Sequence, residues 1–290
     1  MTGAGTMLIE RLEELAGRYD AVLCDVWGCF HNGVAPFPAA VAALEGFRAG
    51  GGKVVLLTNA PRPREAVARH LDGMGAPHSA YDVIVTSGDA TRAELASGRW
   101  GSRPHIVGPE RDDSLWQGLG VEKNALADAD HILCTGLFDD RVETPDDYAD
   151  LVREGVSRDL MFLCANPDIV VDRAEERLYC AGAIAQVYEQ AGGRTRYFGK
   201  PNAPIYELAL RVVGELLGQA PEPARILAIG DGPNTDVLGA EQAGLDCLFV
   251  SGGLAAAEVG EDPEHPDPAR LTQYLEAHGR APRYTIGRLR

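Results

Sequence analysis

The sequence has few lysines and no long apolar run. Lysine occurs only at Lys53, Lys123 and Lys200, and Asp plus Glu outnumber Lys plus Arg by 43 to 27, for a formal net charge of −16. Such a charge repels phosphate backbones and anionic lipid surfaces, so we expect neither nucleic acid nor a membrane as a partner. An anionic ligand would need a metal ion, backbone amides or a local cation to bind here.

Signals for export and for paired cysteines are also missing. No stretch of about 18 apolar residues occurs, and residues 1–20 lack the basic segment and apolar core of a signal peptide. The six cysteines include no C-x-x-C pair, and most lie in apolar runs, so we expect buried thiols in a reducing compartment. These absences predict a cytoplasmic protein.

Length and composition predict a globular chain with more than one domain. The 290 residues correspond to about two domains of ordinary size. With 45% hydrophobic and 24% charged residues, the chain has the composition of a packed globular protein. We therefore expect one sizeable core and a second module.

Short apolar runs that alternate with helix-like segments predict a parallel sheet. The runs are AVLCDVWG (21–28), KVVLLTNA (53–60), YDVIVTSGDA (81–90), RILAIGDG (225–232) and CLFVSGG (247–253). Strands of this kind, separated by helices, are typical of a parallel sheet covered on both faces. The expected fold class is a doubly wound α/β core.

A further set of apolar runs lies between the third and fourth of these strands. It consists of HIVGPE (105–110), HILCTGL (131–137) and LMFLCANPDIVV (160–171), with helix-like stretches between them. We expect an inserted second α/β domain over residues 90–190 and the core in residues 1–89 and 191–290.

Polar residues follow several of the expected core strands. In open parallel sheets, ligands bind outside the carboxyl ends of the strands, so these residues are candidates for a site. The candidates are Asp25, Thr58, Asn59, Asp231, Asp236 and Lys200. Lys200 stands just before a helix that Pro204 is expected to help start.

Together these residue types have the chemistry of a phosphoryl-transfer site. Asp25 and Asp231 can hold Mg²⁺, Lys200 adds a fixed cation, and Asp25 can attack phosphorus. Each residue alone also has an ordinary structural explanation: an Asp that ends a strand caps helices and turns, and a lysine is often a solvated surface group. Several such signals at strand ends of one chain favour the functional interpretation.

Four ordered motifs resemble those of the haloacid dehalogenase superfamily of hydrolases. They are D-V-W-G-C-F-H-N-G (25–33), L-L-T-N-A (56–60), G-K-P-N (199–202) and G-D-G-P-N-T-D (230–236). The insertion between the second and third motifs, with C-A-N-P-D-I-V-V (164–171), is similar to the cap of the class IIA branch, which is NagD-like or nitrophenylphosphatase-like. The resemblance implies a Rossmann-like core with an inserted α/β cap domain.

The resemblance assigns a nucleophile and a metal site. It implies that Asp25 is the nucleophile and a Mg²⁺ ligand, that the backbone carbonyl of Trp27 is a second ligand, and that Asp231 is the third protein ligand. Asp236 would orient water on the metal. The implied intermediate is an aspartyl-phosphate on Asp25.

The resemblance also assigns substrate contacts. Thr58 and Lys200 would hold the phosphoryl oxygens with catalytic effect, and Asn59 would line the same pocket. Asn166 and Asp168 in the cap would face the leaving group. The implied activity is that of a Mg²⁺-dependent phosphatase acting on a small phosphorylated metabolite, such as a sugar phosphate or nucleotide, and a homodimer is expected by analogy with the family.

Trp27 departs from the family pattern. The phosphatases of the family carry a second Asp two residues after the nucleophile, which protonates the leaving group and then activates water. Three explanations follow: His31 substitutes as the catalytic acid and base, the substrate has a good leaving group, or the protein binds a phosphorylated metabolite with little turnover. His31 can equally be a packed histidine without a catalytic role.

An aromatic residue at position 27 also resembles the D-x-Y-G start of the superfamily's true dehalogenases. Those enzymes displace halide from carbon without needing the metal. The intact G-D-G-P-N-T-D (230–236) favours a retained cation, so a dehalogenase is the less favoured interpretation.

Overall fold

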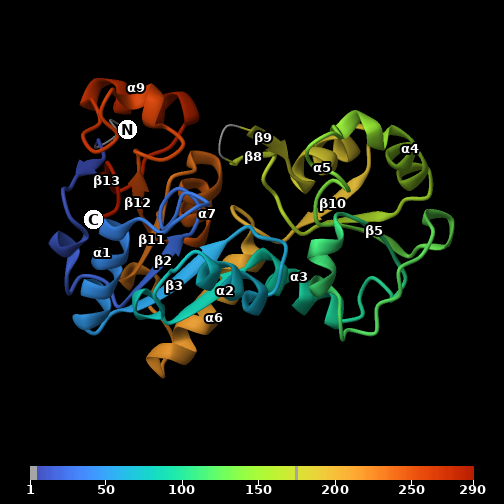
Figure 1. The fold of residues 1–290 in the computed structure, drawn as a ribbon, viewed down its shortest axis with the longest axis horizontal. Helices are drawn as coiled ribbons and strands as arrows, with labels where there is room; N and C mark the ends of the chain where they lie inside the picture. The colour runs from blue at the N-terminus through green and yellow to red at the C-terminus, as the bar shows by residue number, and fades with distance from the viewer. Residues whose placement is uncertain (1–4, 174–175) are drawn as a thin grey trace. The chain divides into compact units, whose positions relative to one another are not determined.

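The computed structural model describes residues 5–173 and 176–290. Contacts within the chain divide it into two compact units, whose elements are labelled in Figure 1. The first unit comprises Met1–Thr58, Ala68–Val85 and Tyr206–Arg290, and the second comprises Asn59–Val67 and Thr86–Ile205. Residues 1–4, which the expected core domain includes, lie outside the described part. The second unit takes in residues on both sides of the segment 90–190 in which we expected an inserted domain.

A seven-stranded sheet forms the centre of the first unit, in the order β1-β13-β12-β11-β2-β3-β4. The strands are β1 (Met7–Leu8), β2 (Ala21–Asp25), β3 (Lys53–Thr58), β4 (Val83–Thr86), β11 (Ile226–Gly230), β12 (Asp246–Val250) and β13 (Tyr284–Ile286). The neighbouring strands pair in parallel in β1–β13, β13–β12, β12–β11, β11–β2 and β2–β3. Every residue of β2 and β11 is buried, as expected for central strands covered on both faces. The predicted α/β class is confirmed.

Helices alternate with the strands of the first unit. They are α1 (Pro38–Ala49), α7 (Leu238–Ala243), α8 (Ala256–Val259) and α9 (Pro268–His278), with parts of α2 (Arg64–Gly73) and α6 (Ala203–Leu217). The short helical turns are η1 (Leu12–Leu15), η2 (His78–Ala80), η6 (Pro223–Arg225) and the π-helical η7 (Pro233–Val237). Pro204 is the second residue of α6, which confirms the predicted helix start, because proline is tolerated in the first turn.

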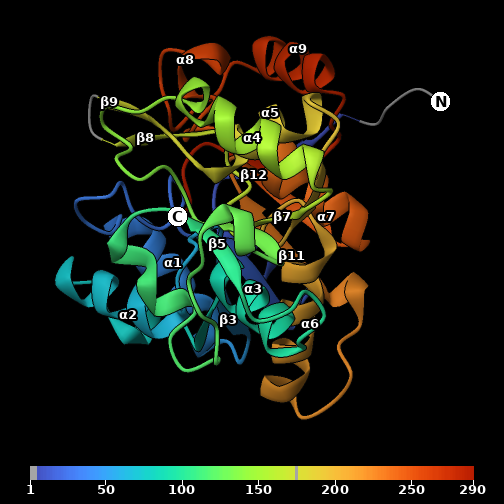
Figure 2. The ribbon, with the colours of Figure 1, turned by 90° about the vertical axis from the view of Figure 1, so that its right-hand side faces the viewer.

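A four-stranded parallel sheet forms the centre of the second unit (Figure 2), in the order β10-β7-β6-β5. Its strands are β5 (Pro104–Val107), β6 (His131–Cys134), β7 (Met161–Cys164) and β10 (Arg194–Tyr197), and β8 (Val170–Arg173) and β9 (Glu176–Tyr179) form an antiparallel pair. The helices are α3 (Ser87–Ala96), α4 (Ala149–Ser157) and α5 (Ala181–Gln190), with the turns η3 (Glu110–Leu115), η4 (Leu126–Asp128) and η5 (Pro145–Tyr148). Strand β10 pairs with β7, so this unit continues beyond residue 190.

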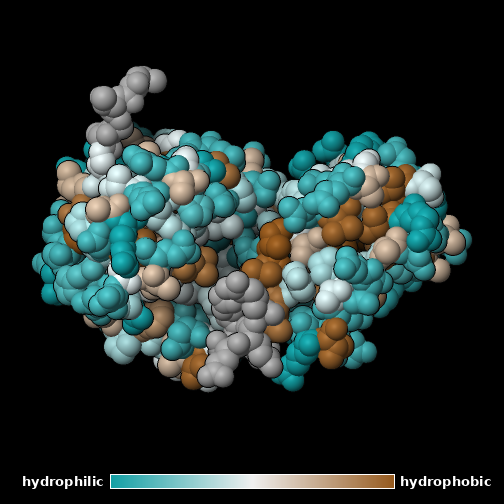
Figure 3. All heavy atoms as spheres, turned by 90° about the horizontal axis from the view of Figure 1, so that it is seen from above, coloured by the Kyte–Doolittle hydropathy of each residue, from teal (hydrophilic) through white to brown (hydrophobic). Residues whose placement is uncertain are grey.

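The surface seen in Figure 3 is mostly hydrophilic, with apolar residues in scattered areas. Among the helices in the described ranges, none is both long enough and apolar enough to cross a membrane. All six cysteines are buried, which confirms the prediction of buried thiols.

Candidate active site

Two aspartates lie together at the carboxyl edge of the first unit's sheet. Asp25 is the last residue of β2, and Asp231 directly follows β11, the strand paired with β2. The carboxylates of these residues and the thiol of Cys29 offer ligand atoms that all lie within 4.8 Å of one another. Asp25 is 7% exposed, Asp231 4% and Cys29 1%. Buried carboxylates at this separation repel each other, and a divalent cation held between them would relieve the repulsion.

Glycines leave room for the Asp231 carboxylate. A Cβ atom added at Gly28 or at Gly253 would overlap it, and Gly28 has a φ of +80°, which favours glycine. The backbone N–H of Leu254 donates a hydrogen bond to Asp231 Oδ2 at 3.0 Å. This fixed carboxylate beside that of Asp25 fits a hard divalent cation, which prefers oxygen ligands.

Asp236 is held within its own loop, in the π-helical segment η7. Its Oδ2 accepts hydrogen bonds from the backbone N–H of Gly232 and from the Thr235 hydroxyl, both at 3.1 Å. A Cβ at Gly230 would overlap the Asp236 side chain, so glycine is required there too. The Asp236 side chain is 4% exposed. It follows Asp231 by five residues in the sequence, but it is not one of the three side chains whose ligand atoms lie within 4.8 Å of one another.

Trp27 and His31 pack against each other in the turn that follows β2. Their ring centroids lie 5.1 Å apart in an edge-to-face arrangement. The turn closes because the His31 N–H donates to the carbonyl of Val26 at 3.0 Å, and the Gly33 N–H donates to His31 Nδ1 at 2.9 Å. Burial lowers the pKa of His31 to about 4. The ring is therefore neutral near pH 7, and a neutral imidazole is a poor acid for a leaving group.

Asn59 joins three other predicted substrate residues into one network in the second unit. Its Nδ2 donates to Asp168 Oδ1 at 2.8 Å and to the Lys200 carbonyl at 3.2 Å, and its Oδ1 accepts from the Lys200 N–H at 2.7 Å. The Asp168 N–H donates to Asn166 Oδ1 at 3.1 Å. Asn59 and Lys200 are both buried. Three segments far apart in the sequence therefore meet in a fixed arrangement.

The predicted site residues thus form two groups, one in each unit. The first unit holds Asp25, Trp27, His31, Thr58, Asp231 and Asp236. The second unit holds Asn59, Asn166, Asp168 and Lys200. Thr58 ends β3 and Asn59 is the next residue, so the chain passes directly from one group to the other.

Comparison with known proteins identifies the family. Sequence models match at residues 22–122 (haloacid dehalogenase-like hydrolase) and at residues 197–277 (HAD-hydrolase-like). A solved structure of a haloacid dehalogenase-like hydrolase from Brucella suis 1330 is 45% identical, with a TM-score of 0.86, over 97% of this chain and 100% of that chain. This chain belongs to the haloacid dehalogenase-like hydrolases.

Two curated relatives of this haloacid dehalogenase-like hydrolase extend over most of its length. The 5′-nucleotidase YutF of Bacillus subtilis (strain 168) is 26% identical over 89% of this chain and 98% of that protein. The D-glycerol 3-phosphate phosphatase of Mycobacterium tuberculosis (strain ATCC 25618 / H37Rv) is 26% identical over 91% of this chain and 71% of that protein. The superfamily predicted from the motifs is confirmed.

Cys29 is a residue of this hydrolase's candidate site that sequence reasoning did not find. The sequence pattern indicated that all six cysteines, Cys29 included, are ordinary buried thiols. Burial, and then the charges of Asp231 and Asp25, raise the pKa of the Cys29 thiol well above its ordinary value. The available signal was its position in the turn directly after the strand-end Asp25.

Asp112 in the second unit is another group that the motifs did not indicate. It lies in η3, is 4% exposed, and has its Oδ1 3.7 Å from Nε of Arg62. Burial raises the pKa of Asp112 to about 6, although Arg62 and Arg111 act in the opposite direction. The folded hydrolase therefore holds this proton more tightly than the unfolded chain does.

Replacing Asp112 with Asn is expected to increase the free energy of unfolding near pH 7.5 by about 1–3 kcal/mol. In the wild type, the stabilisation that comes from the tightly held proton of Asp112 is fully present below about pH 4. It is lost as the pH rises through about 6, because the pKa of Asp112 is higher in the folded state than in the unfolded chain. Urea unfolding near pH 4 and pH 7.5 measures the difference, which should nearly vanish at the lower pH. An equal effect of the substitution at both pH values would contradict this assignment.

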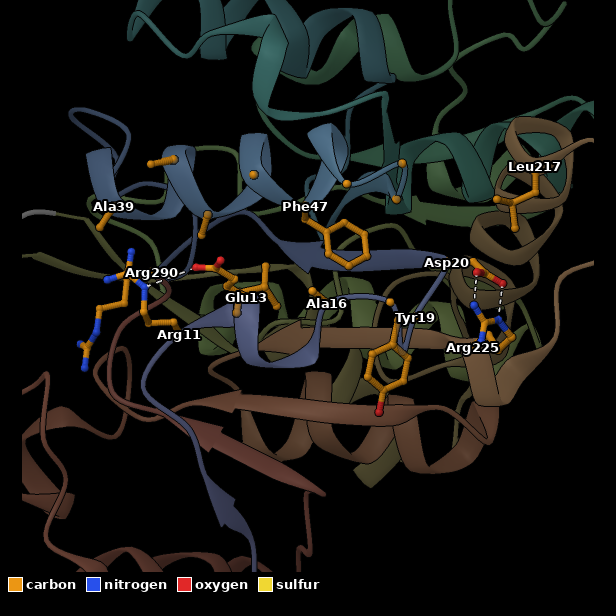
Figure 4. Close-up of a pocket in the computed structure, with 18 residues that line it drawn as sticks. Arg11, Glu13, Ala16, Tyr19, Asp20, Ala39, Phe47, Leu217, Arg225 and Arg290 are labelled. Carbon is orange, nitrogen blue, oxygen red and sulfur yellow. Dashed lines mark hydrogen bonds and ion pairs between the residues drawn. The ribbon is translucent and has the colours of Figure 1, made fainter.

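A separate cavity of the first unit runs along helix α1 (Figure 4). Its volume is about 700 Å³, and it is lined by η1, α1 and residues next to the amino ends of β2, β3 and β11. Asp20 and Arg225 form an ion pair at one end, and Arg290 lies at the other. No described residue that lines this cavity belongs to the candidate active site, so the two are separate.

Proposed function

We propose that this hydrolase is a Mg²⁺-dependent phosphatase that acts on a small phosphorylated metabolite. The observation that carries the proposal is the buried pair Asp25 and Asp231 on adjacent strands, in a space that glycines keep open. A cation at this pair would offset the acidic charge of the chain, which otherwise opposes a phosphate. The names of two relatives, a 5′-nucleotidase and a D-glycerol 3-phosphate phosphatase, support the same reaction class.

In the proposed reaction, the carboxylate of Asp25 attacks the substrate's phosphorus. The bond between phosphorus and the leaving-group oxygen breaks, and an aspartyl-phosphate forms on Asp25. A water molecule then attacks that phosphorus, inorganic phosphate leaves, and the carboxylate is restored. Asp25, Asp231 and the Trp27 carbonyl would hold Mg²⁺, which supplies positive charge opposite the phosphoryl oxygens.

The second unit is proposed to supply substrate contacts and to act as a cap. Lys200 would hold the phosphoryl oxygens together with Thr58 of the first unit, Asn59 would line the same pocket, and Asn166 and Asp168 would face the leaving group. The hydrogen bonds of the buried Asn59 to Lys200 and Asp168 support this role, because they restrict these groups to one geometry before a substrate binds.

Trp27 favours substrates with a good leaving group. The indole N–H is far too weak an acid to protonate a departing oxygen, and the neighbouring His31 is neutral near pH 7. The loss of a positioned acid costs about 10²- to 10⁴-fold in rate. An aryl or acyl phosphate releases an oxygen that is stable as an anion, so its hydrolysis depends least on that acid. We propose such a phosphate as the substrate.

Phosphate release from a panel of aryl, acyl and alkyl phosphates, with Mg²⁺ and with EDTA, tests the proposal. We expect metal-dependent release, with kcat/KM at least about 100-fold higher for the aryl and acyl phosphates than for the alkyl phosphates. No release from any compound, with tight binding of one of them in calorimetry, would instead identify a phosphometabolite-binding protein. Halide release from a haloacid in EDTA would indicate a dehalogenase.

A further inference from the structure

The thiol of Cys29 lies with the two carboxylates of the candidate metal site. Its Sγ and one oxygen each from Asp25 and Asp231 are within 4.8 Å of one another, and all three side chains are buried. The turn that places Cys29 there is closed by the hydrogen bond from the His31 N–H to the Val26 carbonyl. The thiol is thus part of the geometry of the first unit and does not depend on the second.

The separation is compatible with three ligands on one ion. Two ligand atoms on a tetrahedral Zn²⁺ lie about 3.5 Å apart, because Zn–O bonds of about 2.1 Å and Zn–S bonds of about 2.3 Å meet near the tetrahedral angle. Atoms that lie within 4.8 Å of one another reach that separation when the side chains move by about 1 Å. Among the described residues, this is the one group of three such side chains found close enough to share an ion.

Sulfur changes which ions the site prefers. Mg²⁺ takes oxygen ligands, whereas thiolates favour softer ions such as Zn²⁺ and Co²⁺. Resting on the proposed metal site, we infer that Cys29 is a direct sulfur ligand to a borderline-soft divalent ion held by Asp25 and Asp231. As the metal–sulfur bond forms, the thiol proton passes to solvent, and no oxidation is involved. Mg²⁺ binds through the oxygens alone.

Titration of the metal-free, full-length protein with Co²⁺ tests this inference by absorption. We expect a cobalt–thiolate charge-transfer band in the wild type and in Cys247→Ser, and no such band in Cys29→Ser. The Kd for Co²⁺ should rise at least about tenfold in Cys29→Ser, while the Kd for Mg²⁺ changes less than about threefold. Cys247 is a matched control because it is also buried in the first unit, on β12, outside the ligand group.

The outcomes separate this inference from the proposed function. Bound Co²⁺ without a charge-transfer band, or an unchanged band in Cys29→Ser, overturns the sulfur ligand even if Mg²⁺-dependent phosphate release is found. A band that Cys29→Ser removes supports the ligand even if no phosphate is released from any compound. Where Cys29→Ser loses its circular dichroism spectrum, X-ray absorption of the Co²⁺-loaded wild type decides: sulfur at about 2.3 Å supports the inference, and oxygen or nitrogen alone overturns it.

Discussion

Replacing Asp25 with Asn is expected to abolish phosphate release, with kcat/KM lowered at least about 10⁴-fold. The amide cannot form the bond to phosphorus, and it also removes one of the two charges that face the metal. The measurement is phosphate release from the best substrate of the panel, with mass spectrometry to detect an aspartyl-phosphate in the wild type only.

Asp20→Asn is the matched control for that experiment. Asp20 lies at the other end of the same strand and pairs with Arg225 near the surface, so its loss should change kcat/KM less than about threefold. Circular dichroism shows whether both variants are folded. Turnover at the wild-type rate in folded Asp25→Asn would remove Asp25 as the nucleophile.

Replacing Trp27 with Asp is expected to raise kcat/KM for alkyl phosphates by about 10²-fold. The new carboxyl group can protonate a poor leaving group, which the indole cannot. Aryl phosphates should gain less than about tenfold, because their leaving oxygen needs little assistance. The measured quantity is the ratio of kcat/KM for an aryl and an alkyl phosphate, which should fall in the variant.

The Trp27→Phe variant separates the new acid from the loss of the indole. A Cβ at Gly33 would overlap the Trp27 ring, which shows how closely the ring packs, so both substitutions are expected to lower the melting temperature. Phe supplies no proton, and the alkyl phosphate rate should stay at the wild-type level. A similar gain in both variants would show that ring removal, and not acid catalysis, changes the rate.

The local pattern of the chain was sufficient to predict the core and the carboxylate pair. The apolar runs at 21–28 and 225–232 become β2 and β11, because short near-continuous apolar runs are typical of strands buried on both faces. Asp25 and Asp231 then meet because the carboxyl ends of adjacent parallel strands lie at one edge.

The partners of Asn59 were decided by the tertiary structure alone. Its hydrogen bonds reach Asp168 and Lys200, which are 109 and 141 residues away, and neither spacing nor residue type predicts such pairs. The extent of the second unit is likewise set by the pairing of β10 with β7, which continues that unit beyond residue 190.

Sequence by itself determined the fold class, the buried thiols and the strand-end aspartates of this hydrolase, because these depend on local apolar patterns and on a rule for parallel sheets. Tertiary structure decided that Cys29 lies with the carboxylates and that His31 is buried beside Trp27. The turn that follows β2 sets these positions. If its hydrogen bonds were shifted by one residue along the chain, the side chains of Cys29 and His31 would point in other directions. The chemistry of the site therefore depends on distances that residue order does not contain.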